Sequence, residues 1–547
     1  LHLMNIYPVF QHFVDICSMR GWRDLSFKSS KKKKHPDFAF VATNLHTQLF
    51  TVSADPIETT KKNEAKDESA TYMYEFITTG APAAHHLGFD NGGLCRARDN
   101  LEEMIRSLEI TVHNNLVPRE RTHSAVTSDA DAIKEALELE DIMNLLMEDS
   151  ESSKHFFHEE MTKRISTHAQ AVKHREDVVL SQTLSGLAEA FRTKIYLYMH
   201  NREGVDWRWT NMWDIFENCG FLYELESLLS TRGNEQGMLE DAFGGIRSLK
   251  FCQLSVAKDD PDKDDALQEN ENQGAKQNDL NVVTVLDENS DGSEIDNVAV
   301  NDMRFYSHYT RSARSGSVKI TRLCQSDPSN GGGLLITVFV PTRVFSVLPK
   351  KVRDGYRFSC KPLMFTQGIN EQQTLENRLG KKRNLELQTK INLSSYRGLR
   401  EYCKSFGKCA SKLQVPESDM QRARNMLVKV ERHVNNAKPQ QKSCAVLMTS
   451  ANLVRFLAGS RATCCKSAKD RTSMSVTHEE ARCVVGLESS QKKLILSIAN
   501  VLREFGVRIG NARKNVGKKK FAFNQLQQKF LPTEYKPPMC VAGNAVS

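Results

Sequence analysis

The stretch Arg461-Ala-Thr-Cys-Cys-Lys-Ser-Ala-Lys-Asp-Arg-Thr472 carries the strongest signal for the fold of this 547-residue chain. Five residues separate Cys465 from Arg471, and this spacing can build a tight loop at a helix N-terminus, with successive backbone N–H groups turned inward. Such a concavity, together with the positive end of the helix dipole, binds a dianionic phosphate. Strand patterns followed by helical patterns around this one site predict an α/β catalytic domain, with a central sheet and flanking helices.

The residues of the loop predict a cysteine nucleophile. The field that binds phosphate also stabilises a thiolate, so Cys465 can attack phosphorus at neutral pH. Arg471 can offer its planar fork to two phosphoryl oxygens as charge spreads in the transition state. Ser467 and Ala468 are small and keep the loop narrow, and Thr472 starts the following helix with a hydroxyl that can contact the thiolate or the phosphoenzyme.

Charged residues inside the loop indicate what kind of phosphate it binds. Lys466 and Lys469 place two cations on the rim, which favours a headgroup with several phosphates, although both can also simply be solvated. Asp470 has two interpretations. It is either a general acid that protonates the leaving inositol oxygen, or a carboxylate that points outward and orders Arg471.

Two motifs outside the loop need a separate interpretation. The stretch from Cys17 to Arg23 has the same spacing, but its loop would have to hold bulky Met19 and Trp22, so we interpret Cys17 as structural. The polar segment GINEQQT, residues 368–374, either lines the site or caps a helix.

The pattern along the chain divides it into three parts. Residues 1–256 form a mixed and mostly helical N-terminal region. Residues 257–303 are acidic and nearly free of aromatic residues, which predicts a disordered linker or insertion. Residues 304–547 form the expected Cys-x5-Arg phosphatase domain. Helical spacing recurs in that domain at 420–435, 444–458 and 494–505.

The net charge of +8 understates how basic most of the chain is. Residues 258–300 hold 13 acids and 3 lysines, a charge of −10, so the rest of the chain carries +18, the difference between +8 and −10. Such a surface suits phosphates, anionic lipid or nucleic acid, and charge alone does not choose among them. The runs Lys31–Lys34 and Lys518–Lys520 can dock on anionic lipid or remain solvated.

Cysteine and histidine usage argues against metal and disulfide chemistry. The 13 cysteines show no repeated spacing, so a zinc site or a secreted disulfide framework has little support. We therefore expect reduced and mostly buried thiols, including Cys464 beside the nucleophile. The histidines between residues 155 and 174 do not form the HExxH pattern, and no metal or other cofactor is expected.

The segment CKSAKDRTSMSVT resembles the active-site signature of the inositol polyphosphate 4-phosphatases, which remove the 4-phosphate from phosphatidylinositol 3,4-bisphosphate. The loop alone would also suit myotubularins and bacterial inositol phosphatase effectors, which share the Asp-Arg-Thr ending. Four further segments resemble the 4-phosphatase family in the same order along the chain: PVFQHFVDICSMRGWRDLSFKSS, TTGAPAAHHLGFDNGGL, FTQGINEQQTLENRLG and RKNVGKKKFAFNQLQQKFLPTEYKPP.

The resemblance implies metal-independent hydrolysis through a phosphocysteine, with Cys465 and Arg471 matching the family's cysteine and arginine. It implies a phosphatidylinositol-3,4-bisphosphate 4-phosphatase of the cytoplasm, peripherally associated with endosomal or plasma membranes. The expected partners are this lipid, soluble inositol polyphosphates and an anionic membrane surface, and not nucleic acid.

Three departures from the family pattern keep alternatives open. The family usually carries an N-terminal C2-type lipid-binding domain that is not visible here, so we expect a fragment of a longer product. The approach Gly459–Cys464 is less apolar than a buried strand should be, and residues 257–303 look like an insertion. These features support a non-catalytic phosphoinositide-binding scaffold as the alternative. A dual-specificity protein phosphatase is another, which Lys466 and Lys469 disfavour.

Overall fold

The structure is a computed structural model that describes most of the chain. The described ranges are 45–53, 71–82, 92–116, 151–202, 206–259, 282–283, 305–308, 318–323, 333–380, 382–438 and 441–543. Cys17 and the run Lys31–Lys34 lie outside them, as does most of the acidic stretch 257–303.

Ten strands of the described ranges form one mixed sheet, in the order β5-β6-β1-β2-β10-β3-β9-β4-β8-β7. The four central strands β2, β10, β3 and β9 run parallel to one another, whereas β1 pairs antiparallel with β2. The strand bounds are β1 His46–Ser53, β2 Thr71–Gly80, β3 Phe221–Ser227, β4 Cys252–Lys258, β5 Val282–Val283, β6 Phe305–His308, β7 Val318–Leu323, β8 Gly333–Val340, β9 Phe358–Thr366 and β10 Ser460–Cys465.

Helices flank this sheet, which confirms the predicted α/β arrangement of a central sheet with helices around it. The helices expected near 420–435, 444–458 and 494–505 are also confirmed, as α12, α13 and α15. The bounds of the longer helices are α2 Leu94–Leu116, α4 Glu151–Asn201, α6 Met212–Cys219, α7 Asn234–Ser248, α10 Glu371–Leu379, α11 Lys382–Cys409, α12 Glu417–Asn435, α13 Ala445–Phe456, α14 Asp470–Val485, α15 Lys492–Phe505 and α16 Val507–Val516. Shorter ones are α5 Trp207–Thr210, α8 Thr342–Phe345, α9 Lys350–Arg353 and α17 Gln525–Phe530.

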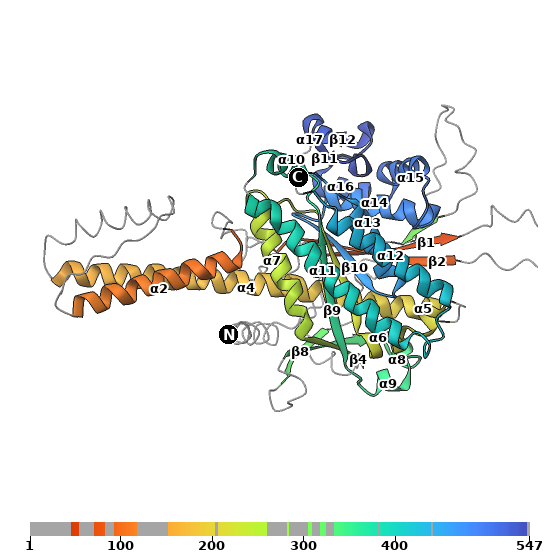
Figure 1. Cartoon of the computed structure of the whole chain (residues 1–547), viewed down its shortest axis with the longest axis horizontal. Coiled ribbons are helices and arrows are strands. Elements are labelled where there is room, and N and C mark those ends of the chain that lie inside the picture. The colour runs from red at the N-terminus through yellow and green to blue at the C-terminus, as the bar shows by residue number, and fades with distance from the viewer. Residues whose placement is uncertain are drawn as a thin grey trace, which may run out of the picture.

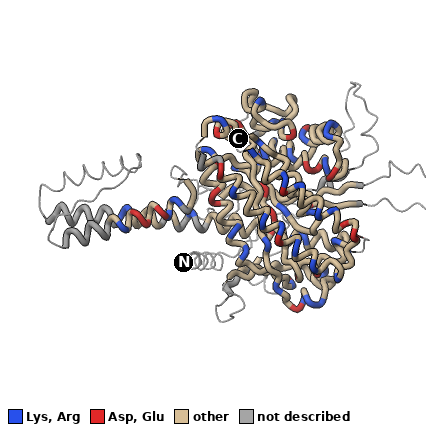
Figure 2. Tube along the Cα trace, viewed as in Figure 1, with Lys and Arg blue, Asp and Glu red and all other residues tan. Residues whose placement is uncertain are grey.

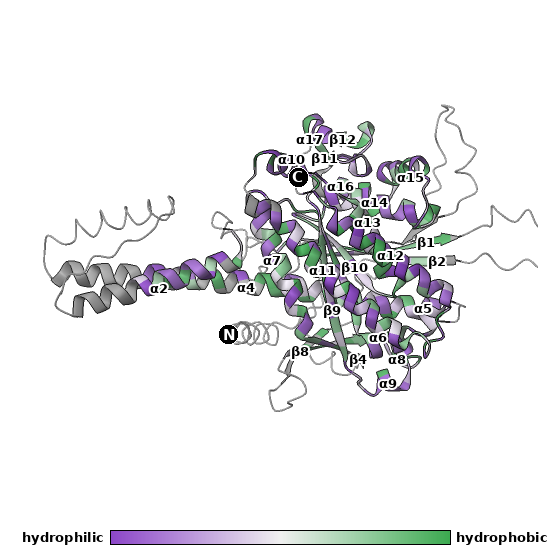
Figure 3. Cartoon of the chain, viewed as in Figure 1, coloured by the Kyte–Doolittle hydropathy of each residue, from purple (hydrophilic) through white to green (hydrophobic). Residues whose placement is uncertain are grey.

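Helices α2 and α4 form an arm that extends away from the body (Figure 1). Figure 2 shows acidic and basic residues interspersed along the described part of this arm. The body itself is covered by helices with mixed polar and apolar residues, such as α11 and α12 (Figure 3). This pattern is typical of helices that bury one face and leave the other in water.

The core lies between the sheet and its helices. Strand β8 alternates between buried and half-buried residues, the period-two pattern of a strand with one face packed. An aromatic cluster fills the space under β3 and β9, and Phe191 of α4 packs edge-on against Phe221 with ring centroids 5.2 Å apart. Such ring pairs add about 0.5–1.5 kcal/mol beyond the area that they bury.

The central position of β10 decides where the predicted catalytic loop lies. Strand β10 pairs with β2 on one side and β3 on the other, and both neighbours come from residues 1–256. The sheet that holds the loop therefore contains strands from both sides of the acidic stretch 257–303. Division of the chain into units at 1–256, 257–303 and 304–547 stays a prediction. In any such division, the first and third units share one sheet.

Candidate active site

The predicted loop lies between the carboxyl end of β10 and the start of α14. Cys465 is the last residue of β10, residues 466–469 form the turn, and α14 begins at Asp470. Backbone bonds fix the strand end on both sides, because Ala81 N–H donates to the Cys465 carbonyl at 2.9 Å and Leu228 N–H donates to Cys464 at 2.8 Å. The strand, turn and helix order expected for a phosphate cradle is thus present. It lies at the carboxyl ends of the parallel central strands, where α/β proteins bind ligands.

The turn itself is narrow. Ala468 has a φ of 51°, in the left-handed region, where a side chain larger than a methyl group would be more strained. Ser473 Oγ and Thr472 Oγ1 both donate to the Lys469 carbonyl, at 2.6 and 3.1 Å, and close the first turn of α14. The Thr472 hydroxyl therefore stabilises the loop in this structure, which is one of the tasks that a hydroxyl at this position can have.

Arg471 is held by Glu235, a residue that the sequence analysis did not single out. Its Nη1 and Nη2 donate to the two carboxylate oxygens of Glu235 at 2.8 and 2.5 Å, and Nη1 also donates to the Leu228 carbonyl at 2.9 Å. Burial alone would raise the pKa of Glu235, but the Arg471 guanidinium and the hydrogen bonds outweigh burial and lower it. The pair is a bidentate arginine–carboxylate contact, the arrangement that fixes a guanidinium plane most firmly.

The GINEQQT segment caps a helix and contacts the residue that holds Arg471. Asn370 caps α10, since its Oδ1 accepts a hydrogen bond from Gln373 N–H at 3.1 Å. Its Nδ2 also reaches Glu235 Oε2 at 3.4 Å, so the segment contacts the partner of Arg471. The capping interpretation is thus confirmed, and lining of the site stays a prediction.

Asp470 connects the Cys465–Arg471 loop to a segment near the C-terminal end of the described residues. Its Oδ1 accepts a hydrogen bond from Ala522 N–H of β11 (Phe521–Ala522) at 2.8 Å. Burial raises the pKa of Asp470, and the hydrogen bond from Ala522 opposes the shift. A raised pKa keeps a proton on the carboxyl at higher pH, which a general acid requires.

The rim lysines differ in their surroundings. Lys466 is exposed, whereas Lys469 is half-buried next to Asp470. Cys464 is buried, and burial raises the pKa of its thiol well above the usual range. Such a thiol is a weak nucleophile, in agreement with the plain structural role expected for it.

Strand β10 is fully buried although its sequence is only partly apolar, and buried ion pairs explain this. Arg461, 2% exposed, forms ion pairs with Glu226 of β3 and Glu479 of α14. Ser475 Oγ donates a hydrogen bond to Glu226 Oε1 at 2.6 Å. Burial raises the pKa of Glu224, the other acid of β3, to about 7. A buried charge is tolerated when it is paired and hydrogen-bonded, so the low hydrophobicity of Gly459–Cys464 does not prevent burial.

Lys442 links two segments that surround the site. Its Nζ donates to the carbonyls of Ile369, Asn370 and Phe530 at 2.8, 2.7 and 2.7 Å. Burial lowers the pKa of this half-buried amine to about 8. Through these bonds the GINEQQT segment and helix α17 share one cation.

The described ranges contain neither a candidate metal cluster nor a candidate membrane-spanning helix. Within these ranges, no group of three or more histidine, cysteine or acidic side chains is placed to hold a metal ion. None of the helices in the described part of the chain has the length and apolar character needed to cross a bilayer.

Comparison with known proteins gives a consistent result. A family model described as INPP4A C-terminal domain matches residues 3–134, 112–268 and 323–535, which is more than half of the chain. The chain is 30% identical over 375 residues to human inositol polyphosphate 4-phosphatase type II, an alignment that covers 68% of this chain and 32% of that protein. The type II inositol 3,4-bisphosphate 4-phosphatase of Pongo abelii aligns with the same identity and coverage.

A more distant similarity extends to the human phosphatidylinositol 3,4,5-trisphosphate-dependent Rac exchanger 2 protein, at 21% identity over 63% of this chain and 20% of that protein. The chain thus spans about a third of the length of the 4-phosphatases that it matches.

Proposed function

Since the chain belongs to the inositol polyphosphate 4-phosphatase family, we propose that it hydrolyses the 4-phosphate of phosphatidylinositol 3,4-bisphosphate. The observation that carries the proposal is the position of Cys465 and Arg471 at the two ends of one loop between β10 and α14. The names of the relatives support inositol phosphates as the substrate class.

The reaction would proceed in two steps. The Cys465 thiolate attacks phosphorus, an S–P bond forms, and the P–O bond to the inositol ring breaks as the leaving oxygen takes a proton. Water then attacks phosphorus, the S–P bond breaks, and inorganic phosphate leaves with the thiolate restored. The reaction needs positioning and charge stabilisation more than covalent chemistry from other residues.

The residues around the loop would divide these tasks. Backbone N–H groups of residues 466–471 and the N-terminus of α14 attract the phosphate oxygens, and Arg471 binds two of them. Glu235 is a positioning residue that orients Arg471. Asp470, or an acidic residue from another loop, gives the proton to the leaving oxygen. Lys466 and Lys469 bind further phosphates of the headgroup.

We also propose that the protein acts at a membrane surface. The substrate is a lipid, and the basic excess outside residues 258–300 would attract an anionic membrane. Peripheral association with endosomal or plasma membranes and activity on soluble inositol polyphosphates are parts of the same proposal.

The test is phosphate release from phosphatidylinositol 3,4-bisphosphate in the presence of a chelator, with the unchanged chain and Cys465→Ser compared. Turnover that persists in chelator and is lost in the variant would support the cysteine mechanism. Tight lipid binding by both proteins without turnover would favour the non-catalytic scaffold instead. A preference for phosphopeptides over the lipid would favour a dual-specificity protein phosphatase.

A further inference from the structure

Residues 517–531, here called the C-terminal bridge, contact the candidate active site at two points. At one end, Ala522 N–H donates to Asp470 Oδ1 at 2.8 Å, beside the catalytic loop. At the other end, the Phe530 carbonyl shares Lys442 with Asn370, and Gln527 Nε2 donates to Glu371 Oε1 at 3.1 Å. The bridge therefore runs from the catalytic loop to the GINEQQT segment, which contacts the Arg471–Glu235 pair.

The bridge begins with a tight turn that carries three consecutive lysines. Gly517 ends α16 with a φ of 77°, a left-handed conformation that favours glycine, and its N–H donates to the Arg513 carbonyl at 2.8 Å. Lys520 N–H then bonds to the Lys518 carbonyl at 2.9 Å and closes the turn. The turn therefore places three lysines at consecutive positions of a short, closed segment of backbone.

The three lysines are not equivalent. Lys520 Nζ donates to the Cys540 carbonyl at 2.7 Å and is thereby tied to the protein. Lys518 and Lys519 are both exposed. Three residues of extended chain span at most about 10 Å, so the backbone of Lys519 lies within that distance of the Ala522–Asp470 bond. Lysines at consecutive positions carry like charges, and a bound anion offsets the repulsion between them.

We propose that Lys518 and Lys519 join Lys466 and Lys469 of the loop in a subsite for the second phosphate monoester of the substrate, beside the phosphate that the Cys465–Arg471 loop binds. This inference rests on the proposed function. Lysine suits the task because its ammonium is a compact point charge on a flexible stem, and it can follow a phosphate on a neighbouring ring carbon. The ligand chemistry is an inositol ring with two phosphates, whether the ring belongs to a lipid or to a soluble inositol phosphate.

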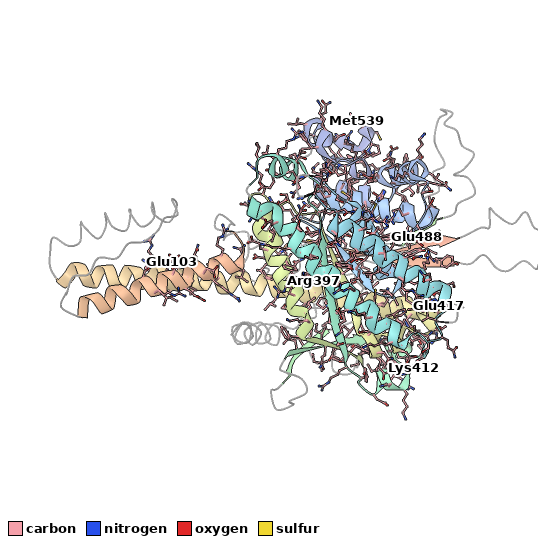
Figure 4. The ribbon with its side chains drawn as sticks, in the orientation of Figure 1. Glu103, Arg397, Lys412, Glu417, Glu488 and Met539 are labelled. Atoms are coloured by element: carbon pink, nitrogen blue, oxygen red, sulfur yellow. The ribbon has the colours of Figure 1, made fainter. Side chains whose placement is uncertain are left out.

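The experiment compares Lys518→Gln/Lys519→Gln with the unchanged chain on a soluble inositol bisphosphate and the corresponding inositol monophosphate. Lys412→Gln is the matched control, because Lys412 is also an exposed lysine. It lies at the end of the body opposite Met539 (Figure 4). Met539 marks the position of the lysine turn, since it precedes Cys540, whose carbonyl accepts a hydrogen bond from Lys520. We expect the ratio of kcat/KM for bisphosphate to that for monophosphate to fall roughly tenfold in the double variant, mainly through KM. Lys518→Arg/Lys519→Arg should largely retain the ratio.

Two results would overturn the subsite. One is an unchanged ratio in the double variant. The other is a loss seen only with lipid in vesicles that contain phosphatidylserine and not with the soluble bisphosphate, since that result would mean that the lysines bind the membrane surface.

Failure of the proposed function can be told apart from failure of the subsite. The soluble bisphosphate is titrated into two proteins: Cys465→Ser, and Cys465→Ser that also carries Lys518→Gln and Lys519→Gln. Because neither protein has the nucleophile, the titration measures binding without turnover. A roughly tenfold weaker affinity with the glutamines would support the subsite even if the chain has no phosphatase activity, and equal affinities would remove it.

Discussion

Replacing Glu235 with glutamine removes the carboxylate that holds Arg471 and keeps the size of the side chain. Arg471 now donates to both carboxylate oxygens of Glu235, at 2.8 and 2.5 Å. A glutamine amide offers only one acceptor oxygen and no charge, so one charge-assisted hydrogen bond is lost and the other keeps only the charge of its guanidinium donor. The remaining bond from Arg471 to the Leu228 carbonyl should keep the guanidinium in the site, although less well oriented.

The size of the effect follows from the bonds that change. A hydrogen bond to a charged group contributes about 1.5–3 kcal/mol, so we expect the misoriented guanidinium to raise the barrier by about 2 kcal/mol. That corresponds to a roughly 30-fold lower kcat. KM should change little, because the charge of Arg471 and the N–H groups of the loop still attract the substrate phosphate. This split between kcat and KM distinguishes a positioning residue from one that only stabilises the fold.

The assay is steady-state release of phosphate from phosphatidylinositol 3,4-bisphosphate in mixed micelles. Glu240→Gln is a suitable control, since Glu240 lies on the same helix and accepts a hydrogen bond from Gly93 N–H, which a glutamine oxygen can also accept. A thermal melt of each protein checks that it is folded. The reasoning would be refuted if Glu235→Gln kept its kcat within about threefold, or if KM rose while kcat did not change.

Three further outcomes are expected. Arg471→Lys keeps the charge but loses the fork, so most of the activity should disappear, and near-normal turnover in the same assay would contradict the role of Arg471. Burial lowers the pKa of Lys442 to about 8, so between pH 8 and the ordinary lysine value of 10.5 the unfolded chain binds the extra proton and stability rises with pH. The urea midpoint of the unchanged chain should therefore rise relative to Lys442→Met between pH 7.5 and 9.5, and a constant difference would count against this linkage. Arg461→Met leaves the Glu226 carboxylate buried without an arginine partner, whereas Glu479 keeps its ion pair with Arg455, and it should lower the unfolding free energy by about 3–5 kcal/mol. An unchanged urea midpoint would mean that the cluster contributes little.

The sequence predicts those parts of the site that depend on local spacing. Cys465 and Arg471 lie within one loop, and the same seven residues determine both the turn and the start of α14. The helices α12, α13 and α15 were predictable for the same reason, because apolar residues recur at helical spacing within each segment.

The partners of the loop were not predictable from the sequence pattern. Glu235 lies 236 positions before Arg471, and nothing in its own surroundings distinguishes it from other acidic residues at the start of a helix. Arg461 looked unsuited to a buried strand, because its carboxylate partners come from β3 and α14 and depend on the order of strands in the sheet. Local periodicity contains no information on that order.

The central position of β10 has a consequence for how the protein folds. Strand β10 must insert between β2 and β3. Its residue Arg461 contacts Glu226 of β3, which lies 235 positions earlier in the chain. Such long-range pairings make folding slow, because much of the chain must be ordered before they form. During synthesis, β2 and β3 emerge well before β10 and lack their shared neighbour until it arrives. The Cys465–Arg471 loop would thus be among the last parts of the molecule to form, and two co-expressed halves divided within 257–303 would have to associate before β10 could take its place between β2 and β3.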